Sequence, residues 1–269
     1  MEDKMKLMSI ASGSSGNCVY VGSETTSVLV DAGVSRKRIG EGLSSADMDF
    51  KDINAILITH EHIDHTRALG VISRSYGIPM YATADTCSAI EHMPELGSFD
   101  CSLLHPISPD EDFEIGDINI SAHSIWHDAV DPVCYTLHAD GKKVSIATDM
   151  GGFDDYIVHN LQDSDALLVE ANHDVRMLQV GSYPYQLKQR ILGDRGHLSN
   201  ESSGKLIYSL LNDHIKAILL GHLSHENNYP ALAYETVKTE LMGNPYTDDV
   251  REFNLQVAGR SMPGELIEL

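Results

Sequence analysis

The sequence predicts an α/β protein in which two layered β-sheets are covered by helices. About a dozen short apolar runs, rich in Val, Ile and Leu and separated by turn residues, are typical of buried strands. Helical stretches appear in both halves of the chain. The 269 residues contain no internal repeat and no low-complexity linker, so we expect one domain over residues 1–269.

The expected elements follow one another with short connections. The expected strands are Lys6–Ile10, Cys18–Gly22, Ser27–Asp31, Ala55–Ile58, Met80–Ala82, Ile118–His123, Cys134–His138, Lys143–Ala147, Ala166–Glu170, Ala217–Leu220, Asn254–Val257 and Glu265–Leu269. The expected helices are Ser35–Leu43, Thr66–Tyr76, Ala84–Glu91, Pro184–Leu192, Asn200–Leu211 and Ala231–Leu241. Ser199 or Asn200 is expected to cap the fifth helix, because short polar side chains accept hydrogen bonds from the first free N–H groups.

Composition excludes several classes of protein. Hydrophobic residues make up 42% and charged residues 22% of the chain, which excludes a disordered or fibrous protein. The net charge of −21 argues against binding to nucleic acid through a general basic field, although bound cations or local basic patches can reverse the sign at a site. The charged start Met1–Lys6 and the absence of a long apolar run predict no signal peptide and no membrane partner. Four cysteines without CxxC spacing predict buried thiols in a reducing cytoplasm.

The segment His60-Glu61-His62-Ile63-Asp64-His65 carries the strongest chemical signal. It follows directly after an expected strand, where catalytic groups tend to be held on loops by a rigid scaffold. The ligand-type side chains are His60, His62, Asp64 and His65, and their short spacing allows the loop to wrap one or two ions. His60 and His62 are expected to face one ion, and Asp64 and His65 a second.

Each pair leaves its ion short of ligands, so others must come from elsewhere in the chain. His127, Asp149 and His222 each follow an expected strand. A carboxylate such as Asp149 can bridge two ions, as two-metal hydrolases require. Taken alone, each of these residues is better explained by a capped turn or a surface group. Beside the histidine segment, a metal site is the better interpretation.

These residues resemble the pattern of the metallo-β-lactamase superfamily, which has an Asp after an early strand, HxHxDH, a His, a bridging Asp and a final His. Here the pattern falls on Asp31, the segment from His60 to His65, His127, Asp149 and His222, in that order. The resemblance implies an αββα sandwich of two mixed sheets flanked by helices, with two divalent ions at one edge. It gives Asp31 the role of orienting the ligand loop.

Further segments resemble the nuclease branch and, more closely, the YycJ/WalJ/VicX family of bacterial metallohydrolases. They are Ala11–Asn17, Glu170–Asp174, Gly193–Asn200 and Leu220–Asn228. The resemblance implies exonuclease activity on DNA from the 5′ end, with His197 at the leaving-group end of the site and Glu170 orienting it. Where lactamases have a cysteine ligand, this chain has none, and carboxylate and imidazole ligands suit Mn²⁺ as well as Zn²⁺.

Local basic groups are candidate substrate contacts. The cations Lys188, Arg190, Arg195 and Lys205 outnumber the acidic residues of the segment Tyr183–Lys205. This small positive excess beside His197 either guides phosphate or forms a solvated helix face. Arg36-Lys37-Arg38 is a second such cluster. The segment Ser12–Asn17 is either an anion-binding nest or, with more support, a simple loop.

Two histidines have undecided roles. His173 is a candidate phosphate contact or a support for Glu170, and His225 is a candidate ligand, substrate contact or ordinary loop residue.

The sequence therefore predicts a cytoplasmic, metal-dependent phosphodiesterase acting on nucleic acid, with DNA favoured over RNA. Asp64, His197 and Glu170 are the expected catalytic residues. The alternatives are a nuclease that processes RNA, a hydrolase of a small cyclic phosphodiester or a thioester, and a regulatory protein whose metal site is not catalytic.

Overall fold

The structure is a computed structural model that describes residues 5–246 and 254–269. The chain divides into two compact units. The first comprises Met1–Ser124, Ala129–Lys142 and Gly259–Leu269, and the second Ile125–Asp128 and Lys143–Ala258. The expectation of a single domain stays a prediction.

The first sheet has seven strands in the order β14-β1-β2-β3-β4-β5-β6. Their bounds are β1 Lys6–Ala11, β2 Cys18–Gly22, β3 Ser27–Val30, β4 Ala55–Leu57, β5 Met80–Thr83, β6 Leu104–Ile107 and β14 Ile267–Glu268. The sheet is mixed: β14, β1, β2 and β3 pair antiparallel, whereas β3, β4, β5 and β6 pair parallel.

The second sheet also has seven strands, in the order β13-β12-β11-β10-β9-β8-β7. Their bounds are β7 Phe113–Ile115, β8 Ile118–Ser124, β9 Val133–Ala139, β10 Lys142–Ala147, β11 Ala166–Glu170, β12 Ala217–Gly221 and β13 Asn254–Val257. The strands β7, β8 and β9 pair antiparallel, whereas β10, β11, β12 and β13 pair parallel. Each sheet is therefore mixed, as predicted.

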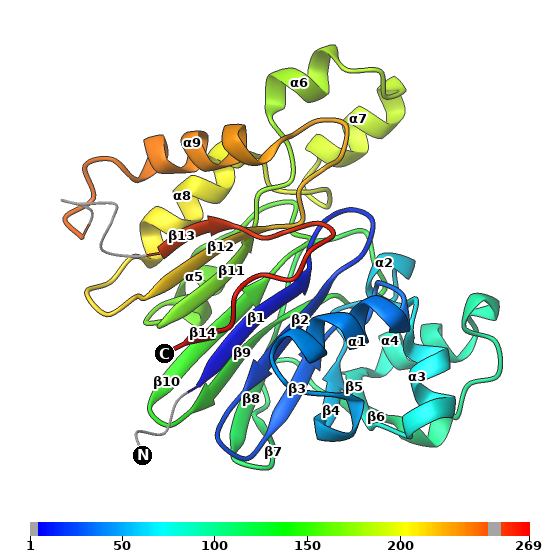
Figure 1. The fold of residues 1–269 in the computed structure, drawn as a ribbon. Helices are drawn as coiled ribbons and strands as arrows, with labels where there is room; N and C mark the ends of the chain where they lie inside the picture. The colour runs from blue at the N-terminus through cyan, green and yellow to red at the C-terminus, as the bar shows by residue number, and fades with distance from the viewer. Residues whose placement is uncertain (1–4, 247–253) are drawn as a thin grey trace. The chain divides into compact units, whose positions relative to one another are not determined.

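Helices bury one face of the first sheet (Figure 1). They are α1 Arg36–Ser45, the short α2 Ile63–Thr66, α3 Leu69–Tyr76 and α4 Ala84–Glu91, with 3₁₀ turns at Phe50–Asp52, Pro94–Leu96 and Cys101–Leu103. The core of this unit joins Ile39 of α1 and Ile72 of α3 to Met8, Leu29 and Ile56 of the strands. Fully buried apolar side chains of this kind each contribute roughly 1.5–3 kcal/mol, so this core is the main source of stability here.

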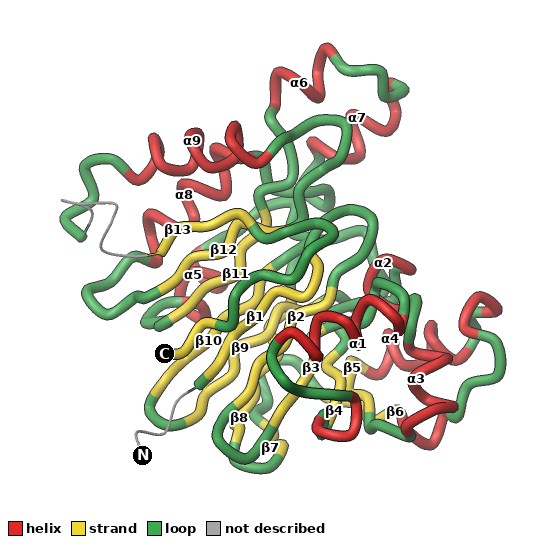
Figure 2. Tube along the Cα trace, in the orientation of Figure 1, coloured by secondary structure: helices red, strands yellow, loops and turns green. Residues whose placement is uncertain are grey.

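The second unit carries the remaining helices, coloured red with the others in Figure 2. They are α5 Asp155–Leu161, α6 Val175–Val180, α7 Tyr185–Leu192, α8 Asn200–Leu210 and α9 Pro230–Leu241. α8 packs against β11 and α9 against β13. Ser199 caps α8, since its side chain accepts from Ser202 N at 3.1 Å, which confirms one of the two predicted caps.

All the predicted strands and helices are present, with ends within a few residues of those expected. The predicted helix Thr66–Tyr76 is broken, because α2 ends at Thr66 and α3 begins at Leu69. The prediction omitted β6, β7, α5 and α6, which are short and carry exposed polar residues.

Two further predictions concern membranes and thiols. Among the described residues, no helix is long and apolar enough to cross a membrane. Cys18, Cys87 and Cys134 are buried as expected, and no disulfide joins any of the four cysteines. Cys101 is exposed, which corrects the expectation for that residue; it begins a short 3₁₀ turn on the surface.

Candidate metal centre

Each unit contains part of the predicted site, at the carboxyl ends of its parallel strands. In the first unit, Asp31 follows β3 and the segment from His60 follows β4, and these two strands are parallel neighbours. In the second unit, Asp149 follows β10 and His222 follows β12. Because parallel strands end at the same edge of a sheet, this topology collects the polar side chains within each unit.

Three of these residues have backbones in the left-handed region. The φ angles are 64° at Asp31, 61° at Asp149 and 53° at His222. Such angles are uncommon for residues other than Gly, and strained backbone of this kind costs roughly 1 kcal/mol or more and is concentrated at functional sites. Each of these residues lies at or just beyond the carboxyl end of its strand, where the chain leaves the sheet.

Thr59 organises the first unit's cluster. Its backbone N–H donates to Asp31 Oδ1 at 2.9 Å, and its hydroxyl lies 2.9 Å from Asp31 Oδ2, 3.0 Å from His60 Nδ1 and 3.2 Å from His65 Nδ1. Asp31 Oδ2 also lies 2.7 Å from His65 Nδ1. Nδ1 of His60 and Nδ1 of His65 are therefore both engaged by neighbouring side chains. Nε2 lies on the opposite edge of each ring, as expected for metal-ligating histidines.

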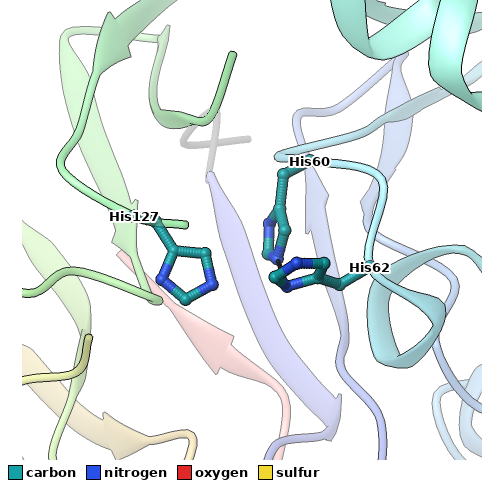
Figure 3. Close-up of side chains that lie close together, drawn as sticks. All are labelled: His60, His62 and His127. Atoms are coloured by element: carbon teal, nitrogen blue, oxygen red, sulfur yellow. Dashed lines mark hydrogen bonds between the residues drawn. The ribbon is translucent and has the colours of Figure 1, made fainter. Parts of the chain in front are cut away.

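His60 and His62 face one another. His60 Nε2 lies 3.1 Å from His62 Nδ1, and the rings meet edge to face (Figure 3). Two nitrogens bound to one tetrahedral ion at the usual distances are about 3.4 Å apart. The first unit thus presents two ligand nitrogens at the separation that a single ion requires.

Asp64 and His65 lie on α2, which is clamped by two loops of the same unit. Asp64 O accepts from Asn17 N at 2.8 Å, and His65 O accepts from Ala32 N at 2.8 Å. A Cβ added to Gly33 would lie 1.5 Å from Asp64 O, so only glycine allows this approach. The side chains also meet, with Asp64 Oδ2 3.8 Å from His65 Nε2.

The second unit gathers its ligand-type groups around Asp149. Asp149 Oδ1 lies 3.4 Å from His222 Nε2 and 3.8 Å from His127 Nε2. All three side chains are almost completely buried. His127, which is labelled in Figure 3, has its Nδ1 3.1 Å from Gly196 O, and burial lowers its pKa. A neutral imidazole of this kind is the form that binds metal.

Glu170 ends β11 and supports two histidines. Its Oε1 lies 2.7 Å from His197 Nδ1 and 2.9 Å from His222 Nδ1, and its Oε2 accepts from Met150 N at 2.9 Å and Leu198 N at 3.1 Å. Burial alone would raise its pKa, but the two imidazoles outweigh burial and bring the pKa down to about 2. Glu170 is therefore a buried carboxylate that fixes both rings.

His197 is the more accessible of these two rings, with 18% of its side chain exposed. Burial acts to lower its pKa, but the charge and hydrogen bond of Glu170 outweigh burial, and the pKa of His197 is raised. Its Nδ1 also lies 3.7 Å from Asp149 Oδ1. A protonated His197 would present Nε2–H to a substrate, as its predicted role in proton donation requires.

The two undecided histidines differ sharply. His173 is 1% exposed, and neither ring nitrogen hydrogen-bonds to a described residue. Its burial lowers its pKa to about 4. His225 is exposed and its Nδ1 lies 3.0 Å from Glu226 Oε1. The buried, neutral His173 and the solvated His225 therefore have different environments, and their functional roles stay predictions.

The basic groups of the second unit also differ from one another. Lys188 donates to Gln179 O at 2.8 Å and Gly181 O at 2.7 Å, so it closes the turn after α6. Arg190 pairs with Asp128. Arg195 is exposed and forms no ion pair with a described residue. Arg195 is therefore the most available of the three candidate phosphate contacts.

The other predicted anion-binding features are used internally. Within Ser12–Asn17, the amides of Ser12, Gly13, Gly16 and Asn17 all donate to groups of the same unit, which confirms a packed loop. In the basic cluster beginning at Arg36, that residue donates to Tyr76 Oη at 2.9 Å. Arg38 donates to Arg260 O at 2.7 Å.

Sequence reasoning missed two supporting residues. Thr59 immediately precedes the histidine segment, and this position is the only indication of its supporting role in the sequence. Asn172 lies in the predicted segment Glu170–Asp174, and its amide donates to His222 O at 2.9 Å. Neither role follows from a local pattern, because each depends on a partner distant in the chain.

The donor set fits a divalent ion. Imidazole nitrogens and carboxylate oxygens are ligands common to Zn²⁺ and Mn²⁺, and no cysteine belongs to either cluster. Within the second unit, one ligand-type atom from each of four residues lies within 4.8 Å of the others; these are Asp149, Glu170, His197 and His222.

Similarity to known proteins shows the family to which the chain belongs. A model of the beta-lactamase superfamily domain matches residues 26–222. The exodeoxyribonuclease WalJ of Streptococcus pneumoniae is 43% identical over 232 residues, which are 86% of each chain. The exodeoxyribonuclease YycJ of Bacillus anthracis is 38% identical, over 86% of this chain and 87% of its own.

Solved structures show the same fold at low identity. The metallo-β-lactamase fold protein YhfI of Bacillus subtilis has a TM-score of 0.71 and 15% identity, covering 99% of this chain and all of its own. The short form of human tRNase Z has a TM-score of 0.64 and 16% identity, covering 97% and 99%.

The protein therefore has the metallo-β-lactamase fold and belongs to the beta-lactamase superfamily. Within that superfamily it belongs to the family of the exodeoxyribonucleases WalJ and YycJ. Both statements confirm what the sequence motifs predicted.

Proposed function

We propose that the protein is a metal-dependent phosphodiesterase that removes nucleotides from DNA, beginning at the 5′ end. The observation that carries this proposal is the ordered ligand geometry, above all Thr59 and Glu170 holding imidazole rings from behind. Two relatives at 43% and 38% identity that are named exodeoxyribonucleases support DNA as the substrate. A cytoplasmic location is proposed because all four cysteines are free thiols, as is usual in a reducing compartment.

Seven residues are proposed to hold two divalent ions, either Mn²⁺ or Zn²⁺. They are His60, His62, Asp64, His65, His127, Asp149 and His222. Bound ions would supply a nucleophile at neutral pH and offset the charge that develops on a phosphate. Asp31 and Thr59 would orient the rings from the first unit, as partners behind metal ligands do in other proteins.

The chain's own groups account for proton transfer. Asp64 is proposed to accept the proton of the attacking water, since its side chain is partly exposed while its backbone is clamped by Asn17 and Gly33. His197 is proposed to donate a proton to the leaving oxygen through Nε2, because Glu170 holds its Nδ1. Lys188, Arg190, Arg195, His173 and His225 remain candidate substrate contacts, with Arg195 favoured by its exposure.

The test is release of label from a 5′-labelled linear duplex DNA in the presence of Mn²⁺, with Asp64→Ala as the control. Wild type should release label while Asp64→Ala loses activity by several orders of magnitude and retains its circular dichroism spectrum. His62→Ala should behave in the same way. Near wild-type turnover by either variant in metal-replete buffer would show that these assignments are wrong.

The same assay separates the alternatives. Cleavage of RNA but not DNA would favour an RNA-processing nuclease. Turnover of a cyclic dinucleotide or a thioester, without action on polymers, would favour a small-substrate hydrolase. Bound metal without hydrolysis of any ester would favour a regulatory metal-binding protein.

A further inference from the structure

Trp126 is the only tryptophan of the chain, and 49% of its surface is exposed. The next residue, His127, is 3% exposed and lies in the second unit's ligand cluster. Large aromatic side chains are usually buried in a protein of this composition, so exposure directly beside a catalytic cluster needs an explanation.

The Trp126 ring is held in place on its inner side. A Cβ on Gly152 would lie 3.4 Å and 3.5 Å from two ring carbons, so the ring lies against the Gly152 backbone. Trp126 O accepts from Gly151 N at 2.8 Å. The indole is therefore positioned by the turn that follows Asp149, with its other surface open to solvent.

The same turn contacts the segment that carries Arg195. A Cβ on Gly151 would lie 2.2 Å from Asp194 O and 2.6 Å from Arg195 N, so glycine is required for this contact. Arg195 is exposed, and His197 follows two residues later. The charge of Asp128, which would repel phosphate near Trp126, is offset by Arg190. An aromatic surface and an available cation thus flank the Gly151–Gly152 turn.

We propose that Trp126 stacks on an unpaired nucleobase of the substrate, next to a phosphate bound by Arg195. Aromatic rings beside basic groups bind single-stranded nucleic acid in this way, without reading sequence, because every base presents a flat face. This proposal rests on the proposed function and adds to it a requirement for an unstacked base at the site. It assigns Arg190 to neutralising Asp128 and leaves the phosphate to Arg195.

The unique tryptophan allows a direct test by its fluorescence. The full-length protein with Mn²⁺ is titrated with a phosphorothioate-linked thymidine oligomer, which resists hydrolysis, and indole emission is followed. An abasic oligomer of equal length and a fully paired hairpin with as many phosphates serve as comparisons. We expect the thymidine oligomer to quench emission strongly, and the abasic oligomer and the hairpin to bind about 5- to 100-fold more weakly. Equal quenching by the abasic oligomer would overturn the proposal.

Variants test the same point through anisotropy of a labelled thymidine oligomer. Trp126→Ala should lose about 5- to 100-fold in affinity, and Trp126→Phe should retain affinity within about threefold, because a phenyl ring also stacks. Tyr208→Ala removes another exposed aromatic, near the far end of α8, and should bind as wild type. Wild-type affinity in Trp126→Ala, or equal losses in the Trp126→Ala and Tyr208→Ala variants, would overturn the proposal.

Hydrolysis of unmodified DNA is measured in parallel so that the two proposals fail separately. Hydrolysis without base-dependent quenching would refute stacking by Trp126 and leave the nuclease function intact. Base-dependent quenching without hydrolysis of DNA would uphold stacking and refute the nuclease function.

Discussion

Glu170 Oε1 lies 2.9 Å from Nδ1 of His222, so a carboxylate at the end of β11 fixes a ring at the end of the neighbouring strand β12. The Glu170→Gln variant replaces the charge with an amide and removes one acceptor oxygen. Metal affinity should fall about 10- to 100-fold, because partners behind ligands contribute in this range. Titration of metal into the chelator-treated protein measures it. Glu226→Gln alters an exposed carboxylate beside His225 and should leave affinity unchanged. Unchanged affinity in Glu170→Gln would refute the role.

His197 is expected to act on the substrate rather than to bind metal. His197→Ala should lower turnover by about 10²- to 10⁴-fold, the usual contribution of a general acid, while metal content stays at the wild-type level. Turnover and metal content are measured on the same preparation, with His159→Ala, at an exposed position of α5, as the matched control. Loss of metal from the His197→Ala variant would instead make His197 a ligand.

Removing the hydroxyl of Thr59 is expected to weaken metal binding. Thr59→Val keeps the shape of the side chain but removes the hydroxyl that contacts Asp31, His60 and His65. Metal affinity should fall about tenfold. Thr239→Val removes a hydroxyl from exposed α9, where it bonds to Glu235 O, and should have no effect on metal. Equal metal affinities in the two variants would show that the hydroxyl of Thr59 is dispensable.

The close approach of Gly33 to Asp64 is open to a stability test. Gly33→Ala places a Cβ against the Asp64 carbonyl and should lower the free energy of unfolding by about 1–3 kcal/mol, as overpacking does. Gly40→Ala, within α1, meets only the Phe50 ring at 3.4 Å and should be neutral or stabilising by about 0.5–1 kcal/mol. Urea unfolding followed by circular dichroism measures both. A Gly33→Ala protein as stable as wild type would contradict this account.

Asp117, between β7 and β8, is expected to make the free energy of unfolding depend on pH. Its small burial acts to raise the pKa, but hydrogen bonds from the loop Ser23–Thr26 outweigh burial and lower the pKa to about 2. A pKa below the unfolded value of 3.8 stabilises the folded state above that pH, and this stabilisation is lost as pH falls toward about 2. Asp117→Asn should therefore be less stable than wild type at pH 6, and the difference should shrink in acid. Ser23→Ala should show the same trend, since Ser23 Oγ donates to Asp117 Oδ1 at 2.6 Å. A difference independent of pH would exclude this explanation.

The strands and the ligand motif were predictable because each has a local signal. Buried runs such as Ala166–Glu170 are apolar over their whole length, and the histidine segment is compact in sequence. By contrast, β6 contains Pro106 and exposed His105, so its sequence does not look like a buried strand. It pairs parallel with β5, so the signal for this strand lies in its neighbour in the sheet and not in its own residues.

The supporting roles were not predictable, because they arise from contacts between distant segments. The partners of Thr59 include Asp31, which is 28 residues away, and Asn172 reaches His222 across 50 residues. The contacts of a basic side chain are likewise known only from the fold. Lys188 is a candidate phosphate contact from the sequence, and only the fold shows that it donates to two carbonyls around a turn.

At Asp31, Asp149 and His222, which have left-handed backbones, the residue that best stabilises the fold differs from the residue that the reaction needs. Glycine would relieve the strain at each position and would remove the side chain. Selection for thermal tolerance alone, with no demand for hydrolysis, should therefore enrich glycine at these three strand ends. Retention of acid and imidazole there in an evolving population would record continued demand for the reaction.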